Sequence, residues 1–364
     1  MTYKFNQLFE DVTHLGVKIP KKDYLIEGKF PIIDQGKSFV AGYTNVEQGA
    51  YMDVPAIVFG DHTRIFKYVT VPFFLGADGI KLLQLKNKSM NCHYLYYALS
   101  AARIPDTGYN RHFKWLKNMS FDIPVGSEQQ RVVGVLDSIE TLIDKKHEMI
   151  YMMDQLIKSR FVEMFGEPGR HIKGFKLTTI GECCELNPKK PENINENLIV
   201  SFVPMADVSE DGKIECYQVR PYKDVKKGFT YFADNDVIFA KITPCMENGK
   251  GAVAQGLING MAFGSTEFHV LRPQKEKTNP YWLYVLTSLN SFRVAARKRM
   301  TGTGGQLRVP VRFLDNYPIY LPPIELQNQF ADFVHQVDKS KLAVKKSLEQ
   351  LEILKKSLMQ QYFG

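Results

Sequence analysis

The spacing of apolar residues predicts two long amphipathic helices, one within residues 121–166 and one within residues 319–364. In both segments, apolar residues recur every seven positions, which is the repeat of a helix that packs along a partner helix. The first heptad series consists of Val135, Leu142, Met149 and Leu156, and it is flanked by Leu136, Ile143, Ile150 and Ile157. The second series consists of Phe330, Val337, Val344, Leu351 and Leu358, with Phe333 and Leu354 at the companion position. Each segment is expected to form one helix of about 35 residues, about 50 Å long.

The two helical segments are copies of one pattern. Residues 158–166 read KSRFVEMFG, and residues 356–364 read KSLMQQYFG, 198 positions later. The match extends backwards without a gap to residues 121 and 319, and it includes the pairs Pro124/Pro322 and Gln129/Gln327. Each copy follows a globular stretch, so the chain is a globule and a helix written twice. The four predicted parts are residues 1–120, 121–166, 167–318 and 319–364.

The two globular parts also resemble each other. HYLYYALSAA at residues 93–102 matches YWLYVLTSLN at residues 281–290, and both have the pattern of apolar, aromatic helices. Earlier in each part, VPAIVFGDHTRIFKYV and NDVIFAKITPCMENGKGAVA each combine a short strand of β-branched and aromatic residues with a polar loop. The predicted fold class is therefore α+β, with two similar mixed α/β domains. The two long helices are expected to pair antiparallel as a coiled coil, which gives the repeat a pseudo-twofold character.

Composition narrows the cellular setting. The 364 residues contain no run of 18 or more apolar residues, so no membrane span is predicted and a cytoplasmic protein is expected. The five cysteines are odd in number and lack C-x-x-C spacing, which favours reduced thiols over a disulfide framework or a zinc site. The eight histidines are scattered without ligand spacing, so no metal site is predicted.

The positive charge of the chain lies in its two globules. The net charge is +8, and each globule carries +5: 15 Lys and Arg against 10 Asp and Glu in residues 1–120, and 21 against 16 in residues 167–318. A polyanionic partner such as nucleic acid would therefore contact the globules. A charge of this size is also common on domains that bind no nucleic acid, where it aids solubility.

Basic and small polar side chains gather in corresponding segments of the two globules. Lys and Arg can neutralise phosphates and reach guanine edges, while Asn and Gln can make paired contacts to adenine. In the first globule, the candidate DNA contacts are Arg64, Lys67, Asn110, Arg111 and His112. In the second globule, they are Lys241, Thr243, Asn248, Lys250, Arg297, Lys298, Arg299, Gln306 and Arg308.

The order of these parts resembles the specificity subunit of type I restriction-modification systems. The resemblance covers the whole chain, and its most specific part is the pair of helices that each follow a proline and end in Phe-Gly. IFAKITPCMENGKGA and TGTGGQLRV resemble segments of the target recognition domains of that family, whereas GDHTRIFK departs from the pattern. The resemblance implies that residues 1–120 and 167–318 are target recognition domains and that the helical parts are spacers.

The resemblance also implies a division of labour among subunits. This chain is expected to bind double-stranded DNA at a bipartite, gapped site and to contain no catalytic residue, metal or cofactor. Two modification subunits are expected to use S-adenosylmethionine to methylate adenine, and restriction subunits are expected to use ATP and magnesium. The residues expected to pair the helices or to dock the modification subunits are Val135, Leu142, Met149, Leu156, Val337, Val344, Leu351, Leu354 and Leu358.

Two other classes of function stay open at this point: a stand-alone DNA enzyme, such as a methyltransferase or a nuclease, and a coiled-coil scaffold. A stand-alone DNA methyltransferase would need a glycine-rich cofactor turn after a strand and an N/D-P-P-Y/F tetrapeptide, but NPYW at residues 279–282 lacks the second proline. A magnesium-dependent nuclease would need a carboxylate pair with a nearby lysine, and the Pro-Asp of IPDTGYN is not followed by E-x-K. A coiled-coil scaffold whose globules bind other proteins is the stronger alternative, and salt-sensitive binding to duplex DNA would distinguish it.

Overall fold

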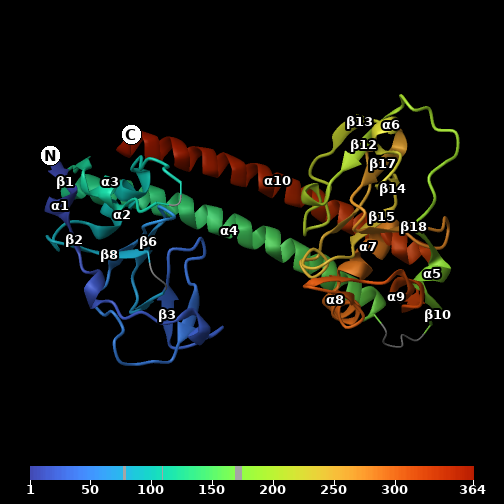
Figure 1. The fold of residues 1–364 in the computed structure, drawn as a ribbon, viewed down its shortest axis with the longest axis horizontal. Coiled ribbons are helices and arrows are strands. Elements are labelled where there is room, and N and C mark those ends of the chain that lie inside the picture. The colour runs from blue at the N-terminus through green and yellow to red at the C-terminus, as the bar shows by residue number, and fades with distance from the viewer. Residues whose placement is uncertain (77–78, 109, 169–173) are drawn as a thin grey trace. The chain divides into compact units, whose positions relative to one another are not determined.

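A computed structural model describes residues 1–76, 79–108, 110–168 and 174–364 of the chain. It divides into two compact units: unit 1 comprises Met1–Lys146 with Ser347–Gly364, and unit 2 comprises His147–Lys346. Each of the two long helices contributes one half to each unit (Figure 1). The division into four parts with boundaries at residues 120, 166 and 318 stays a prediction.

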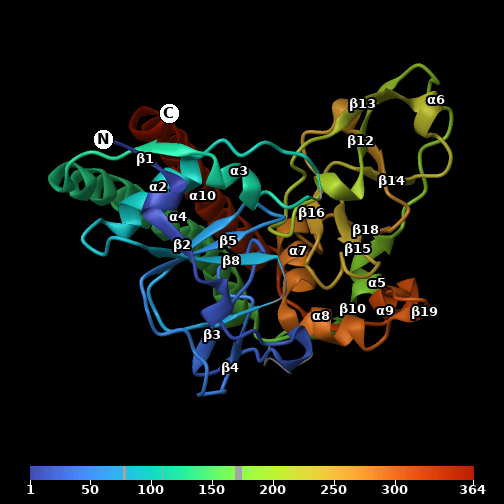
Figure 2. The ribbon, with the colours of Figure 1, turned by 60° about the vertical axis from the view of Figure 1, so that its left-hand side comes forward.

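Unit 1 contains three small sheets, and helix α2 packs beside β6. The strand orders are β2-β8-β5-β6, β4-β3-β7 and β1-β9. Figure 2 labels β2, β8 and β5 of the first sheet and β3 and β4 of the second. Its elements besides the long helices are β1 (Thr2–Lys4), α1 (Phe5–Leu8), β2 (Phe9–Asp11), short 3-10 turns at Thr13–Leu15 and Lys21–Asp23, β3 (Phe30–Ile33), β4 (Gly42–Thr44), β5 (Ala56–Gly60), β6 (Phe66–Val69), β7 (Phe74–Leu75), β8 (Ile80–Leu85), α2 (Cys92–Ala101), α3 (Phe113–Lys117) and β9 (Ser120–Asp122).

Unit 2 contains two four-stranded sheets and two strand pairs. The strand orders are β11-β18-β15-β16, β13-β12-β17-β14, β10-β21 and β19-β20. Its elements are β10 (Lys176–Thr179), α5 (Ile180–Cys183), β11 (Cys184–Leu186), β12 (Ile199–Val203), 3-10 turns at Met205–Asp207 and Ile258–Gly260, β13 (Gln218–Pro221), α6 (Tyr222–Val225), β14 (Thr230–Ala233), β15 (Val237–Ala240), β16 (Gly251–Val253), β17 (Met261–Gly264), β18 (Phe268–Pro273), α7 (Pro280–Ser288), α8 (Asn290–Arg297), β19 (Thr301–Thr303), β20 (Gln306–Arg308), α9 (Val311–Asp315) and β21 (Pro318–Leu321).

The two units repeat one topology, as the sequence predicts. The sheet β2-β8-β5-β6 corresponds to β11-β18-β15-β16, and in the second sheet β3 pairs parallel with β7 as β12 does with β17. The apolar helices α2 and α7 follow β8 and β18, respectively, in the chain. Unit 2 adds α6, β14, α8 and the hairpin β19–β20 to the shared set, so the copies differ mainly in their insertions.

The long helices are also exact counterparts in length and position. Helix α4 spans Gly126–Phe165 and helix α10 spans Ile324–Phe363, so each has 40 residues, more than the sequence predicts. Gly166 stops α4: its φ is +69°, a conformation that glycine adopts without strain, and its N–H donates to the Val162 carbonyl. The linker that follows includes residues 169–173, which lie outside the described residues.

The two helices run antiparallel within each unit. In unit 1, Glu140 pairs with Lys355 at 2.6 Å, and the Arg131 guanidinium lies over the Tyr362 ring. In unit 2, Asp154 pairs with Lys341, and the Phe161 and Phe330 rings pack edge to face with centroids 5.5 Å apart. Residue numbers rise along one helix as they fall along the other, which confirms the predicted antiparallel pairing.

The buried seam of α4 lies one residue away from the predicted series. Val135 is partly buried, but Leu142, Met149 and Leu156 are 42–50% exposed. The series that the sequence analysis treated as flanking takes the inner position instead: Leu136 and Ile157 are buried, and Ile143 and Ile150 are partly buried. Val132 and Ile139, also buried, supply the companion positions. Leu142, Met149 and Leu156 therefore lie outside the buried seam, so helix pairing is wrong for them, and the alternative, that they dock the modification subunits, stays a prediction.

The prediction for α10 is correct for one heptad series of the seam and wrong for the companion series. Val337 and Val344 are buried, and Leu351 and Leu358 are partly buried. Leu354, predicted at the companion position, is 46% exposed and lies outside the seam. The companion position is filled by Val334, Lys341, Leu348 and Lys355. The seam thus includes two lysines, each paired with a carboxylate.

A buried glutamine joins each long helix to the globular part of its unit. In unit 2, Gln327 Nε2 donates to the Lys277 and Pro322 carbonyls, and its Oε1 accepts from the N–H of Asn279, all at 2.9 Å. In unit 1, Gln129 accepts from the N–H of Asn91 and donates to the Pro124 carbonyl. The repeated glutamine therefore fixes how each helix begins.

Removal of this amide is expected to destabilise the fold. Gln327→Ala leaves buried backbone groups without partners and is expected to lower the free energy of unfolding by about 1–3 kcal/mol. Urea unfolding followed by circular dichroism measures the change. Gln329→Ala, on the exposed side of the same helix, is the matched control and is expected to change stability by less than about 0.5 kcal/mol. Equal effects of the two substitutions would show that the amide contributes no specific stabilisation.

Candidate nucleic-acid interface

In each unit, two polar loops meet at the end of one central strand. We call the segment after β5 or β15 the strand loop (residues 61–65 and 241–250). The described residues of the segment before α3 or α9 are the helix loop (residues 102–108 with 110–112, and 298–310). In unit 1, the N–H of His112 donates to the Asp61 carbonyl at 2.9 Å, and in unit 2 the N–H of Val309 donates to the Lys241 carbonyl at the same distance. Because β5 and β15 occupy equivalent places in their sheets, the repeat joins the same two loops twice.

The loops of unit 1 bring three candidate DNA contacts together. The Arg64 guanidinium pairs with Asp106 of the helix loop at 2.6 Å, and Arg64 itself is partly exposed with a φ of +62°. Asn110 and Arg111 are exposed in the same helix loop. The Asn110 carbonyl lies 3.2 Å from the His62 ring, which adds a second link between the loops. Arg64, Asn110 and Arg111 therefore belong to one surface.

Two other candidates of unit 1 are buried and do not face solvent. Lys67 is 4% exposed, and its ammonium donates to the Ser38 carbonyl at 2.5 Å and pairs with Asp34 at 3.4 Å. Burial lowers the pKa of Lys67, and the Asp34 carboxylate opposes that shift. His112 is fully buried, and its Nδ1 lies 2.9 Å from the Asp61 carbonyl. The structure thus corrects the prediction for both residues, which support the loops from inside.

The strand loop of unit 2 is tied to the hairpin β19–β20. Thr243 N–H donates to the Leu307 carbonyl at 3.0 Å, and its hydroxyl donates to the Gly305 carbonyl at 2.7 Å and accepts from the N–H of Leu307. The hydroxyl of Thr243 is therefore engaged within the protein. Gly304 and Gly305 both have positive φ, as the two central residues of a tight type I′ hairpin require.

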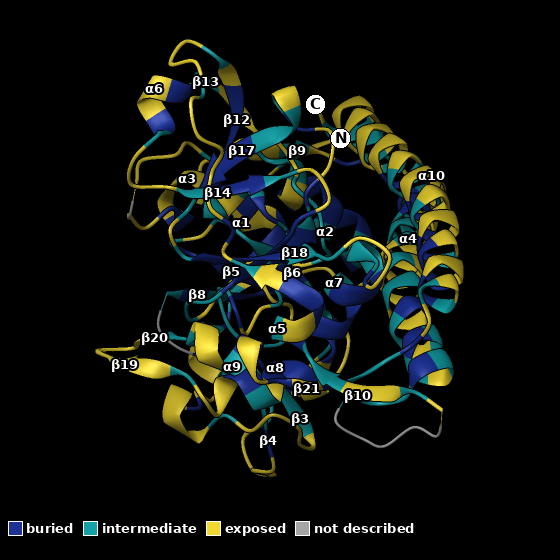
Figure 3. Ribbon diagram, turned by 90° about the vertical axis from the view of Figure 1, so that its right-hand side faces the viewer, coloured by how far each residue is buried: buried dark blue, intermediate teal, exposed yellow. Residues whose placement is uncertain are grey.

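The hairpin places polar groups on the surface of unit 2. Strand β19 is exposed and β20 is mostly of intermediate burial, as the colours of Figure 3 show. Gln306 is exposed on it, and Arg308 is half-exposed, held by a two-pronged pair with Glu267 at 2.7–3.1 Å. That carboxylate also raises the pKa of Arg308. The pair fixes the direction in which Arg308 leaves the sheet.

The remaining candidates of unit 2 differ in their surroundings. Lys298 and Arg299 are exposed beyond the end of α8, and Asn248 is exposed in the strand loop. Arg297 pairs with Glu247 at 2.8 Å, and Lys250 donates to the Met205 carbonyl at 3.1 Å. Lys241 is partly buried, and burial lowers its pKa. Exposed cations and amides thus lie around a loop framework that the other candidates hold in place.

Sequence reasoning missed the residues that support these loops. Arg293 of α8 is buried, donates to the Met246 and Gly249 carbonyls of the strand loop, and lies over the Phe239 ring. In unit 1, the Gln35 carbonyl accepts from the Thr63 hydroxyl at 2.7 Å. An arginine on the apolar face of the short helix NSFRVAAR is the one signal that could have revealed Arg293.

A buried histidine at the base of the hairpin makes the stability of unit 2 depend on pH. His269 Nε2 lies 2.8 Å from the Val309 carbonyl and Nδ1 lies 3.3 Å from Asn187, with Lys241 and Glu267 nearby. Burial lowers the pKa of His269 below the value of an exposed histidine, which is about 6.5. The unfolded chain therefore binds the proton more readily, and stability is lost as the pH falls below about 6.5.

The expected result is a lower melting temperature at pH 5.5 than at pH 7.5, with a smaller difference in His269→Gln. The comparison between variants isolates this ring from the other titrating groups. His147→Gln, on an exposed position of α4, should keep the full difference. A parallel pH dependence in all three proteins would show that His269 does not contribute. Differential scanning calorimetry provides the measurement.

Two searches of the described residues bear on the chemistry of these surfaces. No group of three or more His, Cys, Asp or Glu among those residues is placed to hold a metal ion. A search of the described helices finds none long and apolar enough to cross a membrane. The fold and the paired loops define a class of protein in which one α+β unit is repeated, each copy with its own polar surface.

Comparison with known proteins identifies the family. The model of the type I restriction modification DNA specificity domain matches residues 2–150 and 172–353. These matches cover most of both units, and the chain therefore belongs to this family, as the sequence resemblance indicates.

Individual relatives agree with the family. The chain is similar to the EcoAI type I restriction enzyme specificity subunit of Escherichia coli, with 42% identity over 158 residues, 43% of this chain and 26% of that protein. It is 39% identical over 153 residues to the EcoEI specificity subunit of the same species, which covers 42% of this chain and 25% of that protein. The chain thus spans about a quarter of the length of these relatives.

A solved structure shares the fold over the whole chain. The S subunit of a type I restriction-modification system from M. genitalium aligns with all of this chain and with 96% of its own, at a TM-score of 0.54 and 15% identity. At that identity the likeness concerns the fold alone. It agrees with the predicted class of two repeated α+β parts and two long helices.

Proposed function

We propose that this chain is the DNA-recognition subunit of a type I restriction-modification complex and that it reads a bipartite, gapped site. The observation that carries the proposal is the repeated pair of loops with different exposed side chains. Unit 1 presents Arg64, Asn110 and Arg111, whereas unit 2 presents Gln306 with Lys298 and Arg299. The same framework with different side chains is what two half-sites of different sequence require.

The chemistry of these side chains fits duplex DNA. Exposed Lys and Arg can neutralise phosphates, which supplies affinity and makes it depend on salt. Gln306 and Asn110 can form paired hydrogen bonds to adenine in the major groove, and Arg64 and Arg308 can do so to guanine. The carboxylates of Asp106 and Glu267 each hold one of these two guanidinium groups, so less side-chain freedom is lost on binding.

Catalysis in this proposal belongs to partner subunits. Two modification subunits would use S-adenosylmethionine to methylate adenine, and restriction subunits would use ATP and magnesium to cleave. This chain would contribute no catalytic residue and no cofactor. Exposed apolar side chains on which the modification subunits could pack lie on the long helices of each unit: Leu142 and Leu354 in unit 1, and Met149 and Leu156 in unit 2.

Methylation mapping tests the proposal. The chain would be co-expressed with the modification subunit of the same organism, and adenine methylation would be mapped by single-molecule sequencing with and without this chain. A single gapped motif that depends on this chain is the expected result. Exchange of residues 1–120 for those of a relative should change one half of the motif only. Unchanged methylation despite a folded chain would favour the scaffold function instead.

A further inference from the structure

The hairpin β19–β20 of unit 2 presents Gln306 on a backbone that makes few fixed contacts of its own. The segment TGTGGQLR at residues 301–308 contains three glycines, and all three residues of β19 are exposed. A two-stranded hairpin alone is only marginally stable in water. The position of Gln306 must therefore be set by contacts from outside the hairpin.

Backbone pairing with the strand loop supplies one set of such contacts. The N–H of Thr243 donates to the Leu307 carbonyl at 3.0 Å. Ile242 and Arg308 form an antiparallel bridge beside this bond. The beginning of the strand loop thus lies along β20 as a third strand, which fixes the register of β20. Among the described residues, this backbone pairing ends at Leu307, next to Gln306.

The Thr243 hydroxyl reaches further, to both neighbours of Gln306. It donates to the Gly305 carbonyl at 2.7 Å and accepts from the N–H of Leu307 at 3.1 Å. Leu307 lies opposite Gly302, one step from the pair that closes the turn, so its backbone groups point away from β19 and toward the strand loop. One side chain therefore holds the residue before Gln306 and the residue after it.

The strand loop is itself held by the core of unit 2. Arg293 of α8 is buried and donates to the Met246 and Gly249 carbonyls at 2.9 and 3.2 Å. Its guanidinium lies 4.6 Å from the centre of the Phe239 ring, and Met246 is fully buried. The position of Thr243, and through its hydroxyl that of the turn, is thus set by the core.

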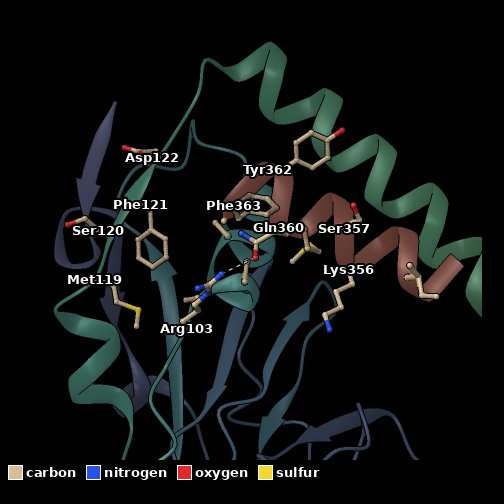
Figure 4. A pocket seen from close by; sticks show the side chains of 16 residues that line it. Arg103, Met119, Ser120, Phe121, Asp122, Lys356, Ser357, Gln360, Tyr362 and Phe363 are labelled. Carbon is tan, nitrogen blue, oxygen red and sulfur yellow. Dashed lines mark hydrogen bonds between the residues drawn. The ribbon is translucent and has the colours of Figure 1, made fainter. Parts of the chain in front are cut away.

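Unit 1 holds its helix loop in a different way. The described residues of that loop, 102–108 with 110–112, form no strand pair. Instead, Arg103 at the beginning of the loop donates to the Gln360 side chain of α10 at 3.0 Å, and Figure 4 shows this pair. A hairpin held by a hydroxyl group therefore distinguishes unit 2 and concerns the half-site that unit 2 reads.

We propose that Thr243 is a positioning residue that determines the specificity of unit 2, because its hydroxyl holds Gln306 in place for contact with a base. An amide reads adenine through two hydrogen bonds, and hydrogen bonds weaken steeply when their angles depart from linear. Gln306 can form both bonds only when the backbone at Gly305 and Leu307 keeps its position. This inference rests on the proposed function, and its test distinguishes the failure of one from the failure of the other.

The test compares two substitutions of Thr243. Thr243→Val keeps the shape of the side chain and removes the hydroxyl, whereas Thr243→Ser keeps the hydroxyl. In Thr243→Val, discrimination is expected to fall about tenfold at one base pair, the same base pair that Gln306→Ala affects. Thr243→Ser should keep the discrimination of the unchanged chain. Thr243→Ala also lacks the hydroxyl and should lose discrimination as Thr243→Val does.

Fluorescence anisotropy of labelled duplexes measures discrimination, with each chain in complex with its modification subunits. The duplexes carry the gapped motif found by methylation mapping and every single-base variant of the half-site that unit 2 reads. Thr278→Val is the matched control, because the buried Thr278 hydroxyl donates to the Cys183 carbonyl at 3.1 Å. It should lower the melting temperature without a change in discrimination. A merely structural role of Thr243 would give the same result as this control.

A double variant tests whether Thr243 acts through Gln306. Thr243→Val added to Gln306→Ala is expected to cause no further loss of discrimination. Full discrimination in Thr243→Val, losses that add in the double variant, or losses at different base pairs would each overturn the role of Thr243. Equal binding of all duplexes by the unchanged chain would overturn the proposed function itself, and the role of Thr243 with it.

Discussion

Replacement of both carboxylates around Lys341 is expected to destabilise the protein by about 3–5 kcal/mol. The ammonium of Lys341 lies 2.6 Å from Asp154 of α4 and 3.0 Å from Asp211 in the loop between β12 and β13. Lys341 is fully buried in the seam of α10. In the double variant Asp154→Asn and Asp211→Asn, this charge stays buried without a counter-charge, and its desolvation is no longer compensated.

Lys341→Met gives the contrasting result that makes the prediction specific. It removes the charge and keeps a long apolar side chain in the seam, so the expected change in unfolding free energy is less than about 1 kcal/mol. Chemical unfolding of the three proteins under the same conditions measures the difference. A matched control is Lys346→Met, because Lys346 is exposed on the same helix. If Lys341→Met were as destabilising as the double variant, the pair itself would be the source of stability.

The pKa values of this cluster agree with an ionised arrangement. The pKa of Asp211 is lowered well below its ordinary value because hydrogen bonds from Ser209 and Lys345 and the charge of Lys341 outweigh the opposing effect of burial. The pKa of Lys341 is raised, because its two carboxylate partners outweigh burial. One cluster therefore joins α4, α10 and the β12–β13 loop of unit 2. The lysine fixes which residues of the two helices face each other, a role that an apolar seam residue cannot perform alone.

The sequence predicted the repeat and the helices well, because both follow from local periodicity. It could not choose between the Val135 series and the Leu136 series of α4, since each position of one has an apolar neighbour in the other. The structure selects the Leu136 series, whose companion positions Val132 and Ile139 are also apolar and buried. The burial of Lys341 was also unpredictable, because its partner Asp211 is 130 positions away in a loop.

The candidate DNA contacts divide in the same way. The exposure of loop positions such as Arg111 and Gln306 could be predicted because their segments are polar and short, and their contact with DNA stays a prediction. Lys67 and His112 are polar residues in similar segments, yet both side chains are buried. Their contacts are with Asp34 and with the Asp61 carbonyl, which are distant from them in the sequence. The sequence pattern therefore located the loops, and only the contacts between loops distinguish the supporting residues from the exposed ones.

Removal of exposed cations is expected to reduce DNA affinity and its dependence on salt together. In Lys298→Gln with Arg299→Gln, each lost phosphate contact should lower affinity by on the order of tenfold and reduce the slope of log affinity against log salt by about 0.9. The effect should be the same for cognate and unrelated duplexes, because phosphates carry no sequence information. Fluorescence anisotropy of labelled duplexes between 50 and 200 mM salt, with the chain in complex with its modification subunits, measures both quantities.

Gln306→Ala is expected to reduce sequence discrimination without changing the salt dependence of DNA affinity. The side chain is exposed on the hairpin and neutral, so the salt slope should stay the same, while discrimination between the cognate half-site and its single-base variants falls by about 1–3 kcal/mol. Lys227→Gln removes an exposed charge elsewhere in unit 2 and controls for net charge. A change in salt slope with Gln306→Ala, or equal effects of Lys227→Gln and the Lys298/Arg299 pair, would place the DNA contact of unit 2 on another surface. With the expected pattern, the hairpin reads bases and the end of α8 holds the backbone, so unit 2 would recognise its half-site through the insertions that unit 1 lacks.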